Sequence, residues 1–189
     1  MERSAISEPA EPSLDELARS AAQGDTTSLE TLLAQIQPRV MRLCMRMLPC
    51  REDAEEACQD AMLRVALKID TFRGQSKFTT WLHTVAGNSA RQTYRSLKRR
   101  AAERPTDQMP THADPRTTSV IAGSRLDLLE ALETLERDRP ELVEVLVMRD
   151  VAELDYAEIA RQLNAPLGTV KSRIHDARLK IRPLLLIKD

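Results

Sequence analysis

Aromatic residues make up only 3% of this chain of 189 residues, and glycine occurs five times. No apolar run approaches the roughly 20 residues that span a bilayer, and alternating β-branched runs are almost absent. Apolar residues still reach 42%. This composition excludes a membrane-spanning helix and favours an all-α protein with small aliphatic cores. The acidic, polar N-terminus is unlike a secretion signal, so we expect a cytoplasmic protein without membrane insertion.

Cysteine is also scarce, because the chain has only Cys44, Cys50 and Cys58. Cys44 and Cys58 occupy apolar positions of helical periodicity, which predicts small buried side chains. The three histidines are scattered and do not complete a zinc ligand set. The sequence also lacks a phosphate-cradling loop and a nucleophile motif. We therefore expect no enzyme, no metal and no cofactor, and an adaptor that senses thiols or metals is one alternative.

Helical periodicity divides the chain into two halves. Three prolines and several threonines separate them, and such a segment cannot bury a core. The prediction is an all-α protein of two small helical domains joined by a flexible linker. Its parts are an N-terminal segment at 1–24 that becomes helical near Ser13, a first domain at 25–100, a linker at 101–123 and a second domain at 124–189.

A net charge of −1 conceals a strong segregation of charge. Residues 125–158 hold eleven acids against four arginines, whereas residues 91–104 hold six basic residues against Glu103 alone. Localised basic patches on a nearly neutral chain predict nucleic-acid contact at separate places. The acidic stretches are expected to limit indiscriminate DNA binding or to meet basic protein partners, and a solvated acidic face is the alternative.

Residues 155–182 have the pattern of a helix-turn-helix. Asp155 and Glu158 form a start signal close to a capping box, and Pro166 ends the first helix because proline lacks an amide proton. A second helix is expected to begin near Gly168. A polar and basic face beside a tight turn suits phosphate and base-edge contacts in the major groove, although a plain hairpin with a solvated cationic side is the alternative. The residues opposite its apolar positions are Lys171, Ser172, His175, Arg178 and Arg182.

Four of the five aromatic residues fall between positions 72 and 94. Cations are interleaved with them, and such rings can stack unpaired bases while cations follow the backbone. We favour the alternative that Phe72, Phe78 and Trp81 mostly close a small core, because few other aromatics are available. The polar, glycine-containing loop that ends at Lys77 can form a pocket for an extruded base.

Two segments together resemble a known family. The segment DAEEACQDAMLRVALKIDTFRGQSKFTTWLHTVAGNSARQTYRSLKRR is similar to the second conserved region of bacterial sigma factors. The segment LDYAEIARQLNAPLGTVKSRIHDARLKIR is similar to their fourth region. Because no third domain separates them, the chain resembles the extracytoplasmic-function (ECF) group of alternative sigma factors. The resemblance covers about 20–100 and 125–186, and FRGQSKFTTWL and GTVKSR are its most specific parts.

The resemblance implies roles for particular residues. The segment that resembles the second conserved region is expected to capture and read the −10 strand. Within it, Asn88 can pair with an exposed base edge. The helix-turn-helix is expected to contact the −35 duplex. The implied −10 residues are Phe72, Arg73, Gly74, Gln75, Ser76, Lys77, Asn88, Arg91, Gln92, Arg95, Lys98 and Arg99. The implied −35 residues are Thr169, Lys171, Ser172, Arg173, His175 and Arg178.

The resemblance also implies partners. These are promoter DNA, both double-stranded and melted, an anti-sigma factor, and the β′ clamp helices and β flap of core RNA polymerase. Family members usually need core polymerase to expose their DNA surfaces, so we expect the free chain to bind DNA weakly. Asp176 stands where a basic residue is common. We expect it to pair with Lys180, four residues later, and the alternatives are that it repels phosphate or accepts from a cytosine amino group. The expected core-binding residues are Asp53, Glu56, Gln59, Asp60 and Arg64.

A plain helix-turn-helix regulator that binds its operator as a dimer, without polymerase, is a further alternative.

Overall fold

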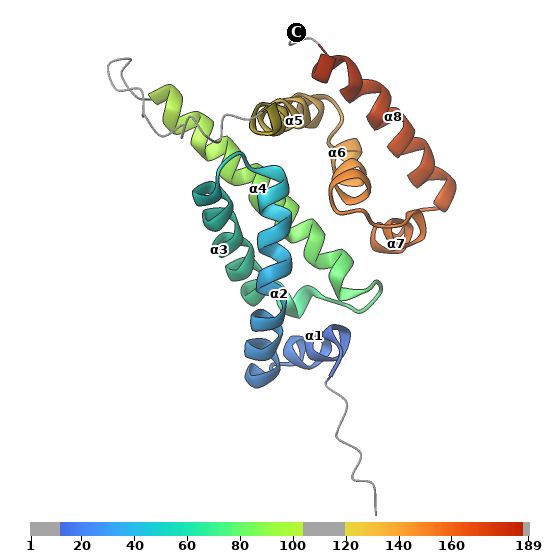
Figure 1. The fold of residues 1–189 in the computed structure, drawn as a ribbon. Coiled ribbons are helices and arrows are strands. Elements are labelled where there is room, and N and C mark those ends of the chain that lie inside the picture. The colour runs from blue at the N-terminus through green and yellow to red at the C-terminus, as the bar shows by residue number, and fades with distance from the viewer. Residues whose placement is uncertain (1–11, 104–119, 187–189) are drawn as a thin grey trace, which may run out of the picture.

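The computed structural model describes residues 12–103 and 120–186, and every regular element within them is helical. Among these residues, no helix is both long enough and apolar enough to cross a membrane. The expected all-α class is therefore confirmed (Figure 1). The expected linker falls mostly on residues 104–119, outside the described part. The elements are α1 Leu14–Ala22, α2 Thr26–Met47, α3 Arg51–Lys68, a 3₁₀ turn η1 Ile69–Thr71, α4 Phe78–Glu103, α5 Val120–Asp138, α6 Pro140–Leu146, a π-helical turn η2 Val147–Val151, α7 Tyr156–Gln162 and α8 Leu167–Leu186.

The first half is a bundle of α1 to α4. Local signals start its helices: Ser13 forms a capping box with Glu16, and the Asp25 carboxylate accepts from the Thr27 amide. The long helices then bury one aliphatic stripe each, as with Leu32 and Ile36 of α2, which are fully buried. This burial leaves α4 running the length of the bundle, with one side free of α2 and α3 (Figure 1).

The second half consists of α5 to α8 and contains the expected helix-turn-helix. Asp155 and Glu158 form the predicted capping box at the start of α7. Asn164 adopts a left-handed φ of 47° in the turn, which asparagine tolerates better than most residues. The second helix begins at Leu167, close to the expected position, and buries Val170 and Ile174.

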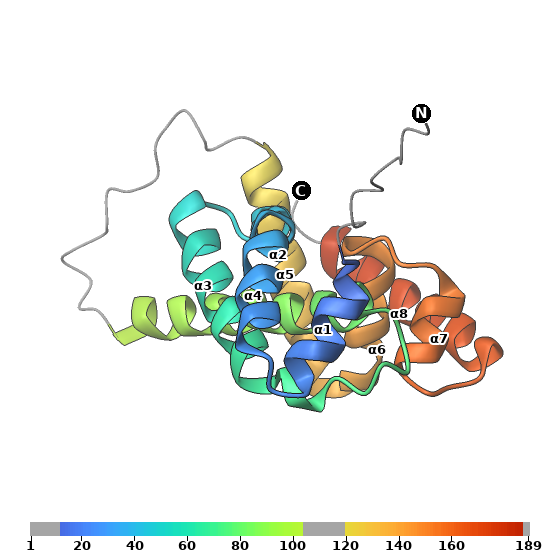
Figure 2. The same cartoon turned by 90° about the horizontal axis from the view of Figure 1, so that it is seen from below.

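The two halves pack against each other through α4. One hydrophobic cluster contains buried residues from both halves. Gly87 of α4 marks a close contact between the halves, because a Cβ built there would meet Cγ1 of Val147 at 2.9 Å. In Figure 2, α3 lies on the left and α6 to α8 lie on the right, with α2 and α4 between them. We call this packed state of the two halves the closed arrangement.

The cysteines behave largely as their positions predict. Cys44 and Cys58 are buried and Cys50 is exposed, with all three reduced. Burial raises the pKa of Cys44 to about 12, so its thiol stays protonated at neutral pH. Within the described residues, no cluster of three or more His, Cys, Asp or Glu side chains is arranged to hold a metal.

Candidate nucleic-acid interface

The expected −10 residues of α4 lie along one strip of that helix. They recur at intervals of three and four positions, so successive members project from the same side. Arg91 is half-buried and donates a hydrogen bond to the side-chain oxygen of Asn88. The structure therefore brings this set together. Its exposed members are Asn88, Gln92, Arg95, Lys98 and Arg99.

Acidic residues of α5 cover the cationic side of this strip. Lys98 Nζ lies 2.7 Å from Oε2 of Glu133. Arg95 Nη1 lies 2.8 Å from Oε2 of Glu136, and Arg91 Nη1 lies 3.6 Å from Oε1 of the same residue. We call these five residues the α4–α5 ion-pair cluster. Three cations suited to bind phosphate are thus occupied by carboxylates of the same chain in the closed arrangement.

Arg91 is the most buried cation of the cluster. Its pKa is lowered by burial, and the negative charge of Glu136 offsets only part of this lowering. Its Nε atom is buried without a hydrogen-bond partner among the described residues. Lys98 is more exposed, and its hydrogen bond with Glu133 raises its pKa. The buried Arg91 therefore depends most on its acidic partner, because an unpaired buried charge is costly.

The aromatic residues around the loop form a core, as the structural alternative predicts. Phe72 and Phe78 are buried and pack edge to face, with ring centroids 5.5 Å apart, while the Trp81 ring lies 5.6 Å from that of Phe78. Phe72 is therefore not an exposed stacking platform. Gly74, between Phe72 and Phe78 in the sequence, has a φ of +66°, which glycine adopts without steric cost.

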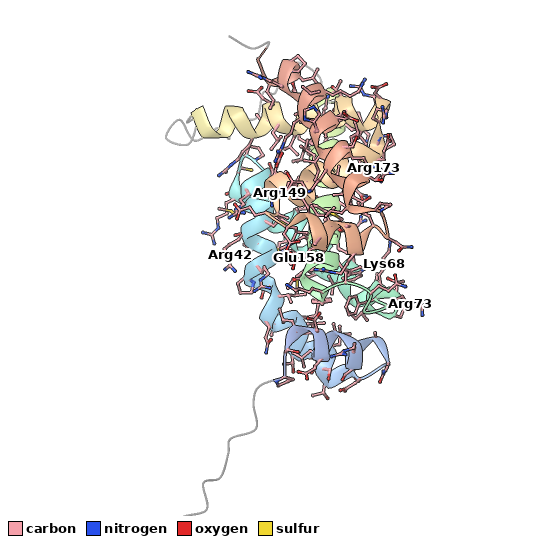
Figure 3. All side chains as sticks on the ribbon, turned by 90° about the vertical axis from the view of Figure 1, so that its right-hand side faces the viewer. Arg42, Lys68, Arg73, Arg149, Glu158 and Arg173 are labelled. Carbon is pink, nitrogen blue, oxygen red and sulfur yellow. The ribbon has the colours of Figure 1, made fainter. Side chains whose placement is uncertain are left out.

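The loop after Phe72 contacts the helix-turn-helix. Ser76 Oγ donates to Oε1 of Gln162, and Lys77 Nζ lies 2.5 Å from Oε1 of Glu158. That pairing raises the pKa of Lys77. Glu158 also completes the capping box of α7, so one carboxylate serves both contacts. Figure 3 shows Glu158 on α7 and Arg73 on the loop, where Arg73 and Gln75 are exposed.

The expected −35 residues do not share one face of α8. Lys171, Ser172 and His175 are exposed, whereas Arg173 and Thr169 are half-buried. The charge of Arg173 acts on the pKa of Glu141 and Glu144, which places it toward α6 (labelled in Figure 3).

Arg178 and Lys180 have partners that the sequence did not predict. Arg178 binds Asp150 through two hydrogen bonds of 2.5 and 3.0 Å, and its pKa is raised by them. Lys180 lies 3.1 Å from Asp138. The expected pairing of Lys180 with Asp176 was therefore wrong, because α5 supplies a carboxylate from outside α8. The exposed −35 set in this state is Lys171, Ser172, His175 and Arg178, and Arg178 is the member held by an acidic partner.

The expected core-binding residues share the outer face of α3. Arg64 connects that face to α4, because it binds Asp60 at 2.8 Å and the Gln92 side-chain oxygen at 2.6 Å. Sequence reasoning missed two exposed apolar residues on the same face, Leu63 at 58% and Leu67 at 70% exposure. Their signal was their position outside the buried series of α3. The expected polar members of the face are Asp53, Glu56, Gln59, Asp60 and Arg64.

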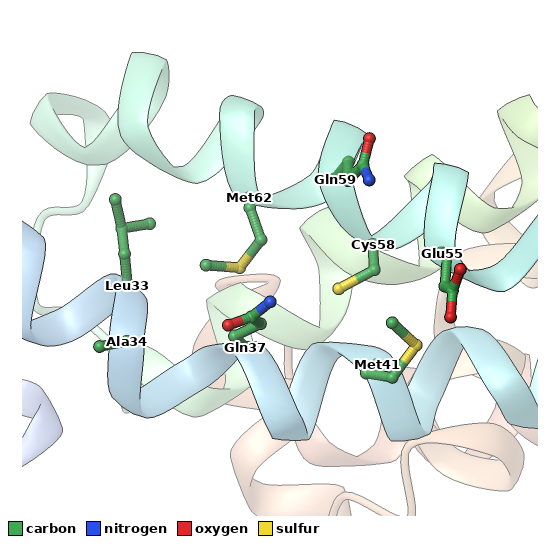
Figure 4. A pocket seen from close by; sticks show the side chains of 8 residues that line it. All are labelled: Leu33, Ala34, Gln37, Met41, Glu55, Cys58, Gln59 and Met62. Carbon is green, nitrogen blue, oxygen red and sulfur yellow. The ribbon is translucent and has the colours of Figure 1, made fainter.

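A groove of about 570 Å³ runs between α2 and α3, beside this face. Figure 4 shows Met41 of α2 and Met62 of α3 extending into it, with Cys58 between them. Flexible thioethers adapt to varied apolar partners. The α3 face and its groove together suit a protein surface better than a nucleic acid, because they combine apolar and acidic groups.

Comparison with known proteins agrees with this geometry. Residues 32–100 match the family model of sigma-70 region 2, and residues 125–181 match that of sigma-70 region 4. The ECF RNA polymerase sigma factor SigW of Bacillus subtilis is 29% identical over 175 residues, covering 88% of this chain and 94% of that protein. The ECF RNA polymerase sigma-E factor of Escherichia coli K12 is 28% identical over 184 residues, covering 89% and 94%.

A solved structure of CnrH in complex with the cytosolic domain of CnrY has a TM-score of 0.51 at 21% identity, and the match covers 93% of this chain and 98% of that one. This likeness supports the fold. The two family matches lie on the two halves that carry the α4 strip and the helix-turn-helix, in the order found in full-length relatives. The chain belongs to the sigma-70 family and, within it, to the ECF sigma factors.

Proposed function

We propose that this chain confers promoter specificity on RNA polymerase through the residues located above. The α3 face binds the β′ clamp helices, the α4 strip and the loop before it bind the melted −10 strand, and α8 contacts the −35 duplex. The strip on α4 is the observation that carries this proposal. It places Asn88, which can pair with a base edge, beside cations that can hold the neighbouring phosphates.

Core polymerase supplies the catalytic centre in this proposal, and the chain itself catalyses nothing. Strand opening is driven by binding energy, because contacts with captured bases offset the cost of unstacking them. Phosphate contacts by Arg91, Arg95 and Lys98 make DNA affinity fall steeply with salt. The action takes place in the cytoplasm, where core polymerase works.

In our proposal, the closed arrangement limits DNA binding by the free chain. The cations that would hold phosphates are bound to Glu133 and Glu136, and Lys77 is bound to Glu158. In our proposal, core polymerase separates the halves, with the β flap holding the second half. An anti-sigma factor that binds both halves would instead keep the halves together and the cations covered.

Run-off transcription tests the proposal. Purified core polymerase is given a promoter library with and without this chain, and start sites are mapped. We expect defined start sites only when the chain is present, with shared −10 and −35 sequences upstream. Unchanged start sites, or binding of the free chain as a dimer to a palindrome, would contradict the proposal and favour a plain helix-turn-helix regulator.

Asn88→Ala separates the two steps of the function. We expect it to reduce promoter opening while leaving the affinity for core polymerase unchanged, because Asn88 lies on α4 and away from the outer face of α3. An equal loss of both would remove Asn88 from its proposed role.

A further inference from the structure

The loop 72–77 forms one wall of a pocket whose opposite wall is α1. The pocket has a volume of about 300 Å³, at the lower end of the roughly 300–1,000 Å³ of small-molecule sites. Phe72 and Gly74 supply an apolar edge and open backbone, and Ser76 and Lys77 supply hydrogen-bond donors. Asp15 and Arg19 of α1 complete the lining.

The wall formed by α1 lies outside both family matches, the first of which begins at residue 32 and the second at residue 125. The apolar side of α1 packs on the bundle through Leu17, Ala18 and Ala21, which are buried. This packing fixes the polar side of α1 over the loop, where a helix provides a rigid support for a binding group.

Asp15 connects α1 to the start of α4, next to the loop. Its Oδ1 accepts a hydrogen bond of 2.6 Å from the backbone amide of Phe78, the first residue of α4. That amide has no partner within its own helix, and a carboxylate there also interacts favourably with the helix dipole. Asp15 therefore caps the −10 helix from a distant part of the chain.

Arg19 brings a cation to the mouth of the pocket. It is exposed, and its Nε donates to the backbone oxygen of Asp15 at 3.2 Å. This hydrogen bond orients the guanidinium, whose terminal nitrogens are donors suited to an oxygen acceptor. In contrast with Lys77, which is bound to Glu158 in the closed arrangement, Arg19 is held by its own helix and stays at the pocket when the halves separate.

We propose that α1 completes the site for the extruded −10 base: Arg19 donates hydrogen bonds to a carbonyl oxygen of that base, and Asp15 positions the pocket. The inference rests on the proposed capture of a base by the loop. It adds a preference, because guanine, cytosine and thymine carry a carbonyl oxygen and adenine does not.

The test uses holoenzyme assembled from core polymerase and the full chain. The probe is a promoter from the run-off selection, made as a fork with its −10 non-template strand single-stranded. Single abasic sites are placed along that strand. With the unaltered chain, one abasic position should weaken binding most, and that position identifies the captured base.

Arg19→Ala should weaken binding to the intact fork about tenfold, the effect of one good bidentate contact. On the fork with the critical abasic site it should cause no further loss, because its partner is already absent. Equal losses on both forks would overturn the role of Arg19, as would no loss on either. If no abasic position matters with the unaltered chain, base capture itself fails, which is a distinguishable result.

Two controls accompany this variant. Arg137→Ala removes one exposed cation whose side chain bonds to Thr134 within α5, and it should bind both forks as the unaltered chain does. Arg19→Lys keeps the positive charge but not the planar guanidinium with its several donors. It should therefore recover only part of the affinity that Arg19→Ala loses for the intact DNA fork.

Asp15 is tested by conservative rescue. Asp15→Asn retains an oxygen that can accept from the Phe78 amide, so the penalty of the abasic site should stay as in the unaltered chain. Asp15→Ala removes the cap and should reduce that penalty at least threefold, while −35 duplex binding stays unchanged. Equal behaviour of the two variants would contradict a positioning role for Asp15.

Discussion

Neutralising two glutamates of α5 should release the proposed DNA-binding surface of the free chain. The double variant Glu133→Gln and Glu136→Gln removes every carboxylate of the α4–α5 ion-pair cluster and preserves side-chain size. The hydrophobic contacts between the halves are unchanged. The variant therefore tests whether charge pairing holds the closed arrangement together.

The expected size of the effect follows from the three ion pairs. Glu133 and Glu136 keep 25% and 28% of their side-chain exposure, so their interactions with cations are partly screened by solvent. Pairs of this kind contribute about 0.5 kcal/mol each, which gives about 1.5 kcal/mol for three. That value corresponds to roughly a tenfold increase in the open fraction. Apparent DNA affinity rises by the same factor while the closed state predominates.

Fluorescence anisotropy of the free chain with a labelled single-stranded DNA measures this affinity. The matched control is Asp138→Asn with Glu141→Gln, which removes the same charge from exposed acids paired within the second half. We expect the control to raise affinity no more than about twofold, through net charge alone. Equal gains for both variants, or no gain for the α5 variant, would refute the reasoning. In 0.5 M salt the difference between them should shrink, because screening weakens exposed pairs.

Three further predictions concern packing and protonation. Gly87→Leu places a side chain where Val147 Cγ1 lies 2.9 Å from a built Cβ, so it should separate the two halves. Fluorescence energy transfer between labels on the two halves should then decrease. The control Gly168→Ala meets open space and should leave the energy transfer unchanged. Cys44 is buried and Cys50 is exposed, and the pKa of the Cys44 thiol is raised to about 12 against about 11 for Cys50. At pH 8, iodoacetamide should therefore modify Cys50 before Cys44, and peptide mass spectrometry can show this order. Prior modification of Cys44 would contradict its burial. Burial lowers the pKa of His83 below 6.5, so on acidification the unfolded chain binds a proton before the folded chain does. The free energy of unfolding should therefore keep its highest value above pH 6.5 and decrease below it. Urea titrations should show a smaller decrease in His83→Gln than in the unaltered chain.

Local signals explain why the elements could be predicted so well. Asp155 and Glu158 begin α7 through contacts three residues apart, and such patterns are readable in one dimension. The same is true of the buried stripe of α8, which repeats at helical spacing. The core alternative for Phe72 also followed from composition, since a chain with few rings places them where burial gains most.

The partners of the site residues could not be predicted, because they are distant in sequence. Ser76 meets Gln162, and Lys98 meets Glu133, only after the two halves pack together. The expected Asp176–Lys180 pair failed for the same reason: a helical spacing permits a pair, but the nearer carboxylate of Asp138 came from another helix. The role inferred for Arg19 likewise depends on how α1 packs over the loop.

The shared use of three cations limits how this sigma factor can change over time. Arg91, Arg95 and Lys98 would bind either DNA phosphates or α5 carboxylates, so added positive charge on this strip would strengthen both associations at once. A higher affinity for promoter DNA could not evolve on this strip without also making the closed arrangement of the free chain more stable. Adaptation to new promoters is therefore expected at neutral positions such as Gln92, which makes no contact with the α5 carboxylates and instead accepts a hydrogen bond from Arg64.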